Sequence, residues 1–455
     1  MANAITTTLT VLPKPTNHHM IQDNDYPKPW PLWQKVLFRF FFIYFMLYIL
    51  SWPAFGNKRL VKTFGRVQNY IIDTIINAFN TKAMHFRDGL TNLNNSNDTS
   101  FRFVQITLYL ILAVTGTIIW SATDRKRQSY YRADYYLKNF IRYFIALISF
   151  VYGSIKVFAL QMKVPSLTDM ALPLGDLTSN RLAWLYVGYS PAYQIFLGLA
   201  EVMAGVLLLY RRTVTLGLLV AFGVYVNVMM INLNYNIVVK MFSINLVIMI
   251  VYLLITDAQR LTNFFILNKP VGSNMHHHVT VPSKKSGRIF RVVLKTFFIL
   301  HAVYLFAGYN KFRMEENVRR EHLVRPVYEG LYEVSTFVKN GDTLPVLAND
   351  DMIWKDIIFE KNETSASVNT ADTLFAKYFS RGIFYYDADT VNKSLACYKT
   401  IKEKRVNLFT LKYNMPDKQH VELRTKIQSD SLYLMLTRSK KQFRLARQKF
   451  KWLVD

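Results

Sequence analysis

Residues 151–158 read VYGSIKVF and close a long apolar run that begins near residue 139. Lys156 therefore carries an ammonium group among side chains that suit a lipid environment. A run of about 20 apolar residues is long enough to cross a hydrocarbon core of about 30 Å as a helix. The run predicts a membrane span, and the lysine must find either a partner or a route to water.

Other runs in the chain have the same length and apolar character. The seven predicted spans are 36–55, 103–122, 139–161, 191–210, 213–233, 238–256 and 289–308. Between the first two, apolar side chains recur at helical spacing from Val67 to Phe79. This spacing predicts an amphipathic helix that lies on the membrane surface or packs against the bundle.

The chain of 455 residues is 51% hydrophobic, with a mean hydropathy of +0.10 and a net charge of +26. This mixture indicates a membrane part joined to a polar part. Basic residues after the second, fourth and sixth spans place those loops and the N-terminus in the cytoplasm. The basic loop 56–102 opposes this topology. We expect the charge to face the cytoplasm and anionic lipid, and we expect no nucleic-acid partner.

After about residue 323, long apolar runs give way to short alternating segments separated by turn residues. Strands are predicted at Gly330–Val338, Met352–Glu360, Thr364–Thr370, Leu374–Ser380, Ser394–Thr400, Val406–Tyr413, Val421–Ile427 and Ser431–Thr437. Such a series is typical of an antiparallel sandwich or barrel. The predicted fold class is thus a membrane all-α helical bundle followed by a C-terminal all-β domain.

These patterns divide the chain into five predicted parts. They are a cytoplasmic N-terminal segment at 1–35, two spans with an outer amphipathic loop at 36–138, a four-helix membrane core at 139–261, a cytoplasmic loop and the seventh span at 262–322, and a periplasmic all-β domain at 323–455.

Polar side chains are predicted to gather near the outer face between the third and sixth spans. Glu201 is deeper than Lys156 and is its best partner by chain position. The depth offset of about 8 Å requires the lysine to reach inward. The candidate ligand-binding residues are Tyr152, Lys156, Tyr193, Glu201, Asn227, Asn234 and Lys240.

A structural explanation competes with a binding site at each of these positions. Lys156, like Arg39 in the first span, can snorkel to the headgroups, and asparagines can cap and crosslink helices. A single cysteine, Cys397, excludes a disulfide within the chain and any Cys-based metal cluster. The run His276–His278 is interpreted as a solvated loop. We assign no metal site and no catalytic residue.

Three stretches resemble the DoxX-like membrane proteins of bacteria: VYGSIKVFALQMKVPS, GLAEVMAGVLLLYRRTVTLGLL and NYNIVVKMFSINLVIMIVYLLITDAQRL. That family carries Gly-x-x-Lys on the first helix of a four-helix unit and Glu on the second, matched here by Gly153, Lys156 and Glu201. The resemblance covers roughly residues 139–261. It implies a bacterial inner-membrane protein, and some members are partners of redox enzymes that pass electrons to quinone.

The resemblance implies an accessory component of a quinone-linked redox system, with the bilayer, a quinone and a redox protein as partners. The chain has no redox cofactor motif of its own. The alternative is a non-enzymatic anchor or scaffold whose β domain binds a lipid or envelope partner. Whether the chain is an enzyme stays open. With Gly330–Tyr332 near its first strand and RQKFKW at residues 447–452, the β domain also faintly resembles lipocalins. This likeness implies a cup for an apolar ligand, although small barrels are more often filled by their own side chains.

Overall fold

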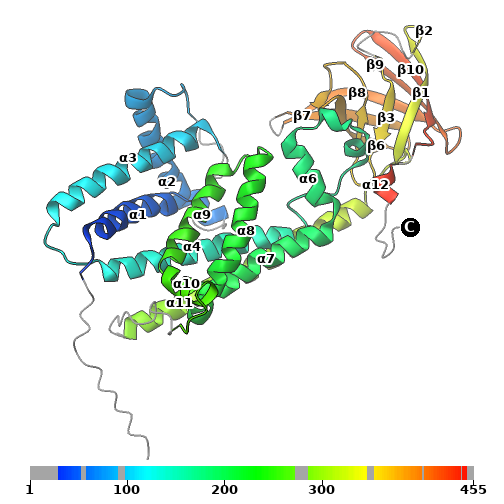
Figure 1. Cartoon of the computed structure of the whole chain (residues 1–455). Coiled ribbons are helices and arrows are strands. Elements are labelled where there is room, and N and C mark those ends of the chain that lie inside the picture. Colours follow the sequence, from blue (N-terminus) through cyan, green and yellow to red (C-terminus); the bar gives the residue numbers. More distant parts are fainter. Residues whose placement is uncertain are drawn as a thin grey trace, which may run out of the picture. The chain divides into compact units, whose positions relative to one another are not determined.

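The computed structural model describes residues 29–52, 58–90, 98–271, 285–345, 353–401, 404–441 and 443–447. The chain forms two compact units, Met1–Ile72 with Gln105–Leu137, and Asp73–Val104 with Lys138–Asp455. Along the chain, helices α1 to α11 precede strands β1 to β10 (Figure 1). The run His276–His278 and most of the N-terminal segment 1–35 lie outside the described residues.

Each long described helix except α2 overlaps a predicted apolar run, and α2 contains the predicted amphipathic segment. The long helices are α1 Leu32–Leu50, α2 Lys58–Phe79, α3 Ser100–Thr123, α4 Tyr131–Val157, α7 Pro191–Leu209, α8 Val214–Asn234, α9 Lys240–Ile255 and α11 Lys285–Glu321. Shorter helical segments are η1 Asn80–Met84, α5 Leu167–Ala171, η2 Leu174–Asp176, α6 Ser179–Tyr189, η3 Arg211–Thr213, α10 Ala258–Phe265 and α12 Arg444–Arg447.

Among the described residues, five helices are long and apolar enough to cross a membrane: α1, α3, α4, α7 and α8 with its short η3 lead-in. Helices α9 and α10 meet at a bend of 76°, and they make a sixth candidate if the bent pair is one span. The seventh predicted span, 289–308, falls within helix α11, and several of its side chains are not among those that the structure describes. The chain is therefore a membrane-embedded helical protein, while the count of seven stays a prediction.

Helix α4 ends earlier than the predicted span 139–161. Its last residue is Val157, and Ala159 takes a φ of +52° that no longer continues the helix. The buried Gln194 side chain replaces the lost helical bonds. Its Oε1 accepts the backbone N–H of Gln161 at 3.2 Å and of Met162 at 3.0 Å. A side chain 32 residues away in the sequence thus binds the backbone that follows the end of the helix.

The prediction that Arg39 can snorkel was wrong, because this side chain is buried at 2% exposure. Its guanidinium donates to Tyr130 Oη at 2.7 Å, to Ser121 Oγ at 2.7 Å and to the Asp124 carbonyl at 2.9 Å. Tyr130 Oη in turn donates to the Asp124 carboxylate at 2.8 Å. The charge on α1 is therefore compensated by α3 and by residues that follow it.

The predicted amphipathic helix at 67–79 is confirmed as a helix and forms the second half of α2. Within it, Ile76 is buried, whereas Tyr70, Ile71 and Ile75 are exposed. Its placement relative to a membrane surface stays a prediction.

The β domain is a closed antiparallel barrel, which decides between the two predicted architectures. Its strands are β1 Gly330–Lys339, β2 Asp342–Leu344, β3 Asp356–Phe359, β4 Ser365–Val368, β5 Ala376–Tyr378, β6 Arg381–Asp389, β7 Ser394–Ile401, β8 Lys404–Asn414, β9 His420–Ile427 and β10 Asp430–Arg438. Eight strands pair in the order β1-β3-β4-β6-β7-β8-β9-β10, and β10 returns to β1. Strands β2 and β5 pair outside this ring.

Strand β6 was not predicted, because no strand was expected over residues 381–389. It follows β5 after Phe379 and Ser380, and Phe379 supplies a φ of +55°. Tight hairpins usually place Gly, Asn or Asp at such a position. Because Phe379 is aromatic, the sequence does not indicate a hairpin turn at this position.

The barrel interior is occupied by the barrel's own side chains. Inward residues alternate with exposed ones, as in β8, where Phe409, Leu411 and Tyr413 are buried as expected from the pattern. Trp354, Phe375, Phe384 and Phe409 form an aromatic centre with ring centroids 5.6 to 6.1 Å apart. These four aromatic side chains occupy the space where the lipocalin resemblance implied a ligand cavity.

Tyr386 offers a stability test of the barrel interior. Its hydroxyl is buried without a hydrogen-bond partner among the described residues, and burial raises the pKa of Tyr386 to about 12. Tyr386→Phe is expected to leave the free energy of unfolding unchanged or raise it by about 1 kcal/mol. Tyr332→Phe should lower it by about 1 kcal/mol, because Tyr332 Oη donates to the Tyr328 carbonyl at 3.0 Å. Denaturant unfolding of both variants checks this contrast.

Candidate functional site

Two glycines bring helices α4 and α7 into backbone contact. A Cβ atom on Gly198 would lie 2.7 Å from the Gly153 carbonyl oxygen and 2.7 Å from the Val157 nitrogen. A Cβ atom on Gly153 would lie 2.9 Å from the Gly198 carbonyl oxygen. Small residues allow this close approach between helices in an apolar environment. The contact fixes the spacing of the side chains that follow on each helix.

Lys156 and Glu201 form an ion pair beside this contact. The lysine Nζ lies 2.6 Å from Glu201 Oε1, and the two residues are 7% and 2% exposed. The lysine therefore reaches inward across the expected depth offset and does not snorkel. The pair compensates both charges within the helical bundle, where an isolated charge is costly.

Three further polar side chains surround the pair. The Lys156 ammonium lies 5.9 Å from the centroid of the Tyr152 ring, within the range of a cation–π contact. Tyr152 also packs on Phe242 of α9. Behind them, Ser149 and Tyr225 share a hydrogen bond of 2.9 Å between α4 and α8. The site thus draws on α4, α7, α8 and α9.

One oxygen of the buried carboxylate remains unused. Among the described residues, Glu201 Oε2 has no hydrogen-bond partner, and neither has the buried Ser154 Oγ. Lys156 offers three N–H donors, and one of them is directed to Glu201 Oε1. The pair can therefore both accept and donate further hydrogen bonds.

The other predicted site residues have different surroundings. Tyr193 is 39% exposed, and its ring packs against Tyr186 and Phe196. Asn227 is exposed on α8, and Asn234 donates to the Met230 carbonyl one turn back. The predicted polar layer is therefore not one cluster, and only Tyr152, Lys156 and Glu201 are brought together.

Lys240 belongs to a helix cap that was missed in the sequence. The Asp98 carboxylate accepts the N–H of Lys240 at 2.7 Å and of Met241 at 3.0 Å, at the start of α9. The Lys240 ammonium adds an ion pair with Asp98 at 3.5 Å. Carboxylates stabilise helix N-termini by binding free N–H groups. The only signal was an aspartate in the polar run NLNNSNDTS.

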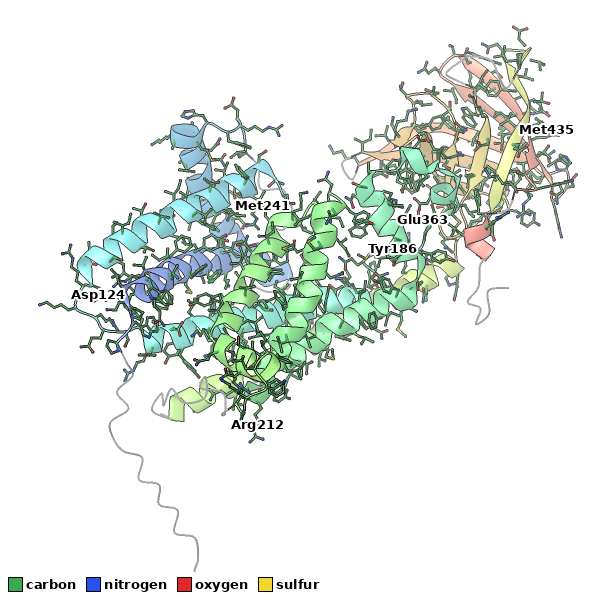
Figure 2. The ribbon with its side chains drawn as sticks, viewed as in Figure 1. Asp124, Tyr186, Arg212, Met241, Glu363 and Met435 are labelled. Carbon is green, nitrogen blue, oxygen red and sulfur yellow. The ribbon has the colours of Figure 1, made fainter. Side chains whose placement is uncertain are left out.

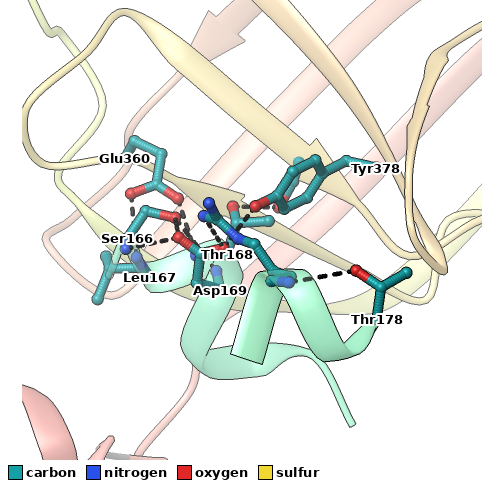
Figure 3. Close-up of polar contacts among 9 residues, drawn as sticks. Ser166, Leu167, Thr168, Asp169, Thr178, Glu360 and Tyr378 are labelled. Carbon is teal, nitrogen blue, oxygen red and sulfur yellow. Dashed lines mark hydrogen bonds and ion pairs between the residues drawn. The ribbon is translucent and has the colours of Figure 1, made fainter. Parts of the chain in front are cut away.

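A second polar network, also missed in the sequence, joins the connection after α4 to the barrel. We call it the α5 clamp, and it comprises Ser166, Leu167, Thr168, Asp169, Arg181, Glu360, Ser367 and Tyr378 (Figure 3). The Glu360 carboxylate accepts the N–H of Leu167 at 3.1 Å and of Thr168 at 2.8 Å, at the start of α5. Ser166 and Asp169 form a capping box on the same helix.

Asp169 is the centre of the α5 clamp. Its Oδ1 accepts Arg181 at 2.6 Å and the Tyr378 hydroxyl at 2.6 Å. Burial acts to raise the pKa of Asp169, but the bonds from Tyr378, Arg181 and Ser166 outweigh it and hold the pKa below its usual value. Burial and the Asp169 hydrogen bond raise the pKa of Tyr378. The carboxylate is therefore ionised and the phenol neutral at pH 7.

The α5 clamp continues into the barrel wall. Thr168 Oγ1 and Ser367 Oγ lie 2.7 Å apart, and Arg381 Nε donates to the same Ser367 oxygen at 3.0 Å. Arg381 also pairs with Asp356. The network therefore reaches strands β3, β4 and β6 from a helix of five residues.

Acid is expected to weaken the α5 clamp. Because the folded-state pKa of Asp169 is lowered, its stabilising contribution is present above the unfolded pKa of about 4 and is lost as pH falls below it. Between about pH 6 and pH 2, the free energy of unfolding should fall more steeply in the natural chain than in Asp169→Asn. An identical slope in both proteins would contradict this role.

Among the described residues, no group of three or more His, Cys, Asp or Glu side chains could hold a metal ion.

Comparison with known proteins finds a relative for part of the chain. The uncharacterized protein YwoB of Bacillus subtilis (strain 168) is 35% identical over 125 residues, which are 27% of this chain and 79% of YwoB. The chain belongs to the YwoB family. No family model and no solved structure matches it. YwoB is described as uncharacterized, so the YwoB family brings no activity to this chain, and the resemblance to DoxX-like proteins stays a prediction.

Proposed function

We propose that the helical bundle binds a quinone-type headgroup at the Lys156–Glu201 pair and serves as an accessory part of a membrane redox system. The observation that carries this proposal is the buried Glu201 Oε2, which has no partner among the described residues and lies beside a lysine with free donors. Buried polar atoms are normally hydrogen-bonded, so an unused carboxylate oxygen in a bundle favours a bound hydroxyl or water.

The residues of the pair suit the two states of such a headgroup. Lys156 can donate an N–H to a carbonyl oxygen, and Glu201 can accept a hydrogen bond from a hydroxyl or exchange its proton. The Tyr152 ring provides an aromatic surface next to the ammonium. A quinone would supply the two-electron chemistry, and a partner enzyme would supply the electrons. The resemblance to DoxX-like proteins adds an inner-membrane location to the proposal, and the distribution of basic residues adds a cytoplasmic N-terminus and a periplasmic barrel.

The test is organic extraction and mass spectrometry of the full chain purified with its native lipids, beside an oxidised-minus-reduced ultraviolet spectrum. We expect a near-stoichiometric quinone that is lost in Lys156→Ala. Lys240→Ala serves as the matched control, because this lysine pairs with Asp98 outside the site, and it should keep the quinone. Equal quinone content in all three proteins would overturn the site assignment.

A second function is favoured by the α5 clamp. In this alternative the chain is a non-enzymatic anchor that holds the barrel for a lipid or envelope partner, and the Lys156–Glu201 pair only links α4 to α7. The clamp supports it because Glu360 and Tyr378 of the barrel bind backbone and side-chain groups of residues 166–181 directly. A barrel that served only as an appendage would not require such a fixed connection.

Limited proteolysis of the full chain tests the anchor function. Glu360→Gln weakens the charge-assisted bonds to the start of α5 and should speed cleavage between residues 160 and 180. Glu333→Gln is a control on the same barrel, since Glu333 contacts Ser439 instead. Unchanged cleavage in Glu360→Gln would remove the support for a fixed barrel.

A further inference from the structure

A hollow of about 290 Å³ lies on the outer wall of the barrel, next to the end of α11. Arg319 and Leu323 line it from the helix side, and Glu363 and Thr364 line it from the turn before β4. Glu363 is labelled in Figure 2. The remaining lining residues come from β6 and β7. This hollow is separate from the filled barrel interior and from the Lys156–Glu201 pair.

The floor of the hollow is a fixed pair of tyrosines. Tyr385 of β6 and Tyr398 of β7 are directly opposed across the two strands. Their rings are stacked, with centroids 5.8 Å apart and planes 28° apart. The Arg405 guanidinium lies 3.8 Å from the Tyr398 ring centroid and pairs with Asp387 at 2.6 Å. Cross-strand and cation–π contacts hold these rings in place before any ligand arrives.

The charges around the hollow are mixed. Glu363 pairs with Lys163 at 3.3 Å, and Arg319 pairs with Glu316 at 2.7 Å. The Glu363 carboxylate in the wall disfavours a phosphate or another anion, and Arg319 disfavours a cation. Thr364 and Thr400 add hydroxyl groups to the lining. A neutral ligand with many hydrogen-bonding groups fits this set best.

We propose that this hollow binds a sugar unit of an oligosaccharide. An aromatic ring carries negative charge on its face, so the polarised C–H face of a sugar can lie on the outer face of Tyr385, because Tyr385 and Arg405 cover the ring of Tyr398. The sugar hydroxyls can donate to Glu363 and accept from Arg319, Thr364 and Thr400. The volume is at the low end for small-molecule sites, so one sugar unit, and not a long segment, determines recognition.

This inference names a sugar as the ligand that the barrel binds in the anchor function. It rests on the anchor function only because it takes the barrel to be a binding domain. The two fail separately, because the anchor function is tested by cleavage of the α5 connection and the sugar site by ligand binding. Neither depends on a quinone.

The experiment uses the full chain in a detergent without a sugar headgroup. Saturation-transfer NMR is recorded with tetrasaccharides of N-acetylglucosamine, of α-linked glucose and of β-linked glucose, and with inorganic phosphate. We expect at least one tetrasaccharide to bind, and we expect the Tyr385→Ala/Tyr398→Ala variant to weaken it by about tenfold or more. The Tyr385→Phe/Tyr398→Phe variant keeps the rings and should bind within about threefold of the natural chain.

Tyr433→Ala is the matched control, because Tyr433 also lies under an arginine on the outer wall of the barrel and should leave binding unchanged. If the alanine double variant does not fold, Glu363→Gln and Thr400→Val replace it, and each should weaken binding. The inference is overturned if no tetrasaccharide binds at millimolar concentration, if binding persists undiminished in the variants, or if phosphate binds in its place.

Discussion

Replacing Glu201 with leucine is expected to lower the free energy of unfolding by about 3–5 kcal/mol. The variant leaves the Lys156 ammonium buried at 7% exposure without the carboxylate that lies 2.6 Å away. An uncompensated charge among membrane helices must reach the headgroups, lose its proton or admit water, and each of these disturbs the packing of α4. Unfolding of the purified chain by increasing sodium dodecyl sulfate in mixed micelles measures the loss.

The double variant Lys156→Leu/Glu201→Leu is the control for this prediction. Removing both charges also removes both desolvation costs, so much of the stability should return. A double variant that loses the sum of the two single losses would show that the two side chains are not coupled. The double variant also allows ligand binding to be tested apart from folding, because it is expected to be stable and lacks the Lys156–Glu201 pair.

Gly198→Ala is expected to produce the second large effect, a loss of about 2–3 kcal/mol. The new Cβ atom would lie 2.7 Å from two backbone atoms of α4 and 2.8 Å from Lys156 Cβ. Backbone atoms cannot move aside as a flexible side chain can, so α4 and α7 must separate. The Lys156–Glu201 distance should lengthen with them.

Gly223→Ala is the matched control for this substitution. A Cβ atom on Gly223, in the membrane helix α8, meets no other atom within 4 Å. Alanine favours helix by about 1 kcal/mol over glycine, so this variant should be as stable as the natural chain or slightly more stable. Equal behaviour of the two variants would contradict the close approach of α4 and α7.

The positions of most helices and strands could be predicted from the sequence. Apolar runs predicted the long helices because the membrane environment requires continuous apolar surface. Alternation predicted most of the barrel strands, as in β8. Two errors had tertiary causes. Gln194 of α7, 33 residues away in the sequence, binds the backbone just beyond the end of α4, and the turn before β6 uses an aromatic residue at positive φ.

The candidate site could be predicted only in part. Lys156 and Glu201 were recognisable because ionisable residues are rare within membrane spans. Their contact depends on the close approach at Gly153 and Gly198, which chain position alone does not show. The α5 clamp could not be predicted for a similar reason, since Asp169 and Tyr378 are 209 residues apart and each is an ordinary polar residue in a short helix or an edge strand.

The most direct test of a ligand site at Lys156–Glu201 compares the quinone content of the natural chain with that of the Lys156→Leu/Glu201→Leu variant. Both proteins are extracted after purification with native lipids, and their folding is first checked by their unfolding transitions. The proposed function predicts a near-stoichiometric quinone in the natural chain and none in the folded double variant. Quinone that is absent from both, or equal in both, would contradict it and leave the pair as a link between α4 and α7.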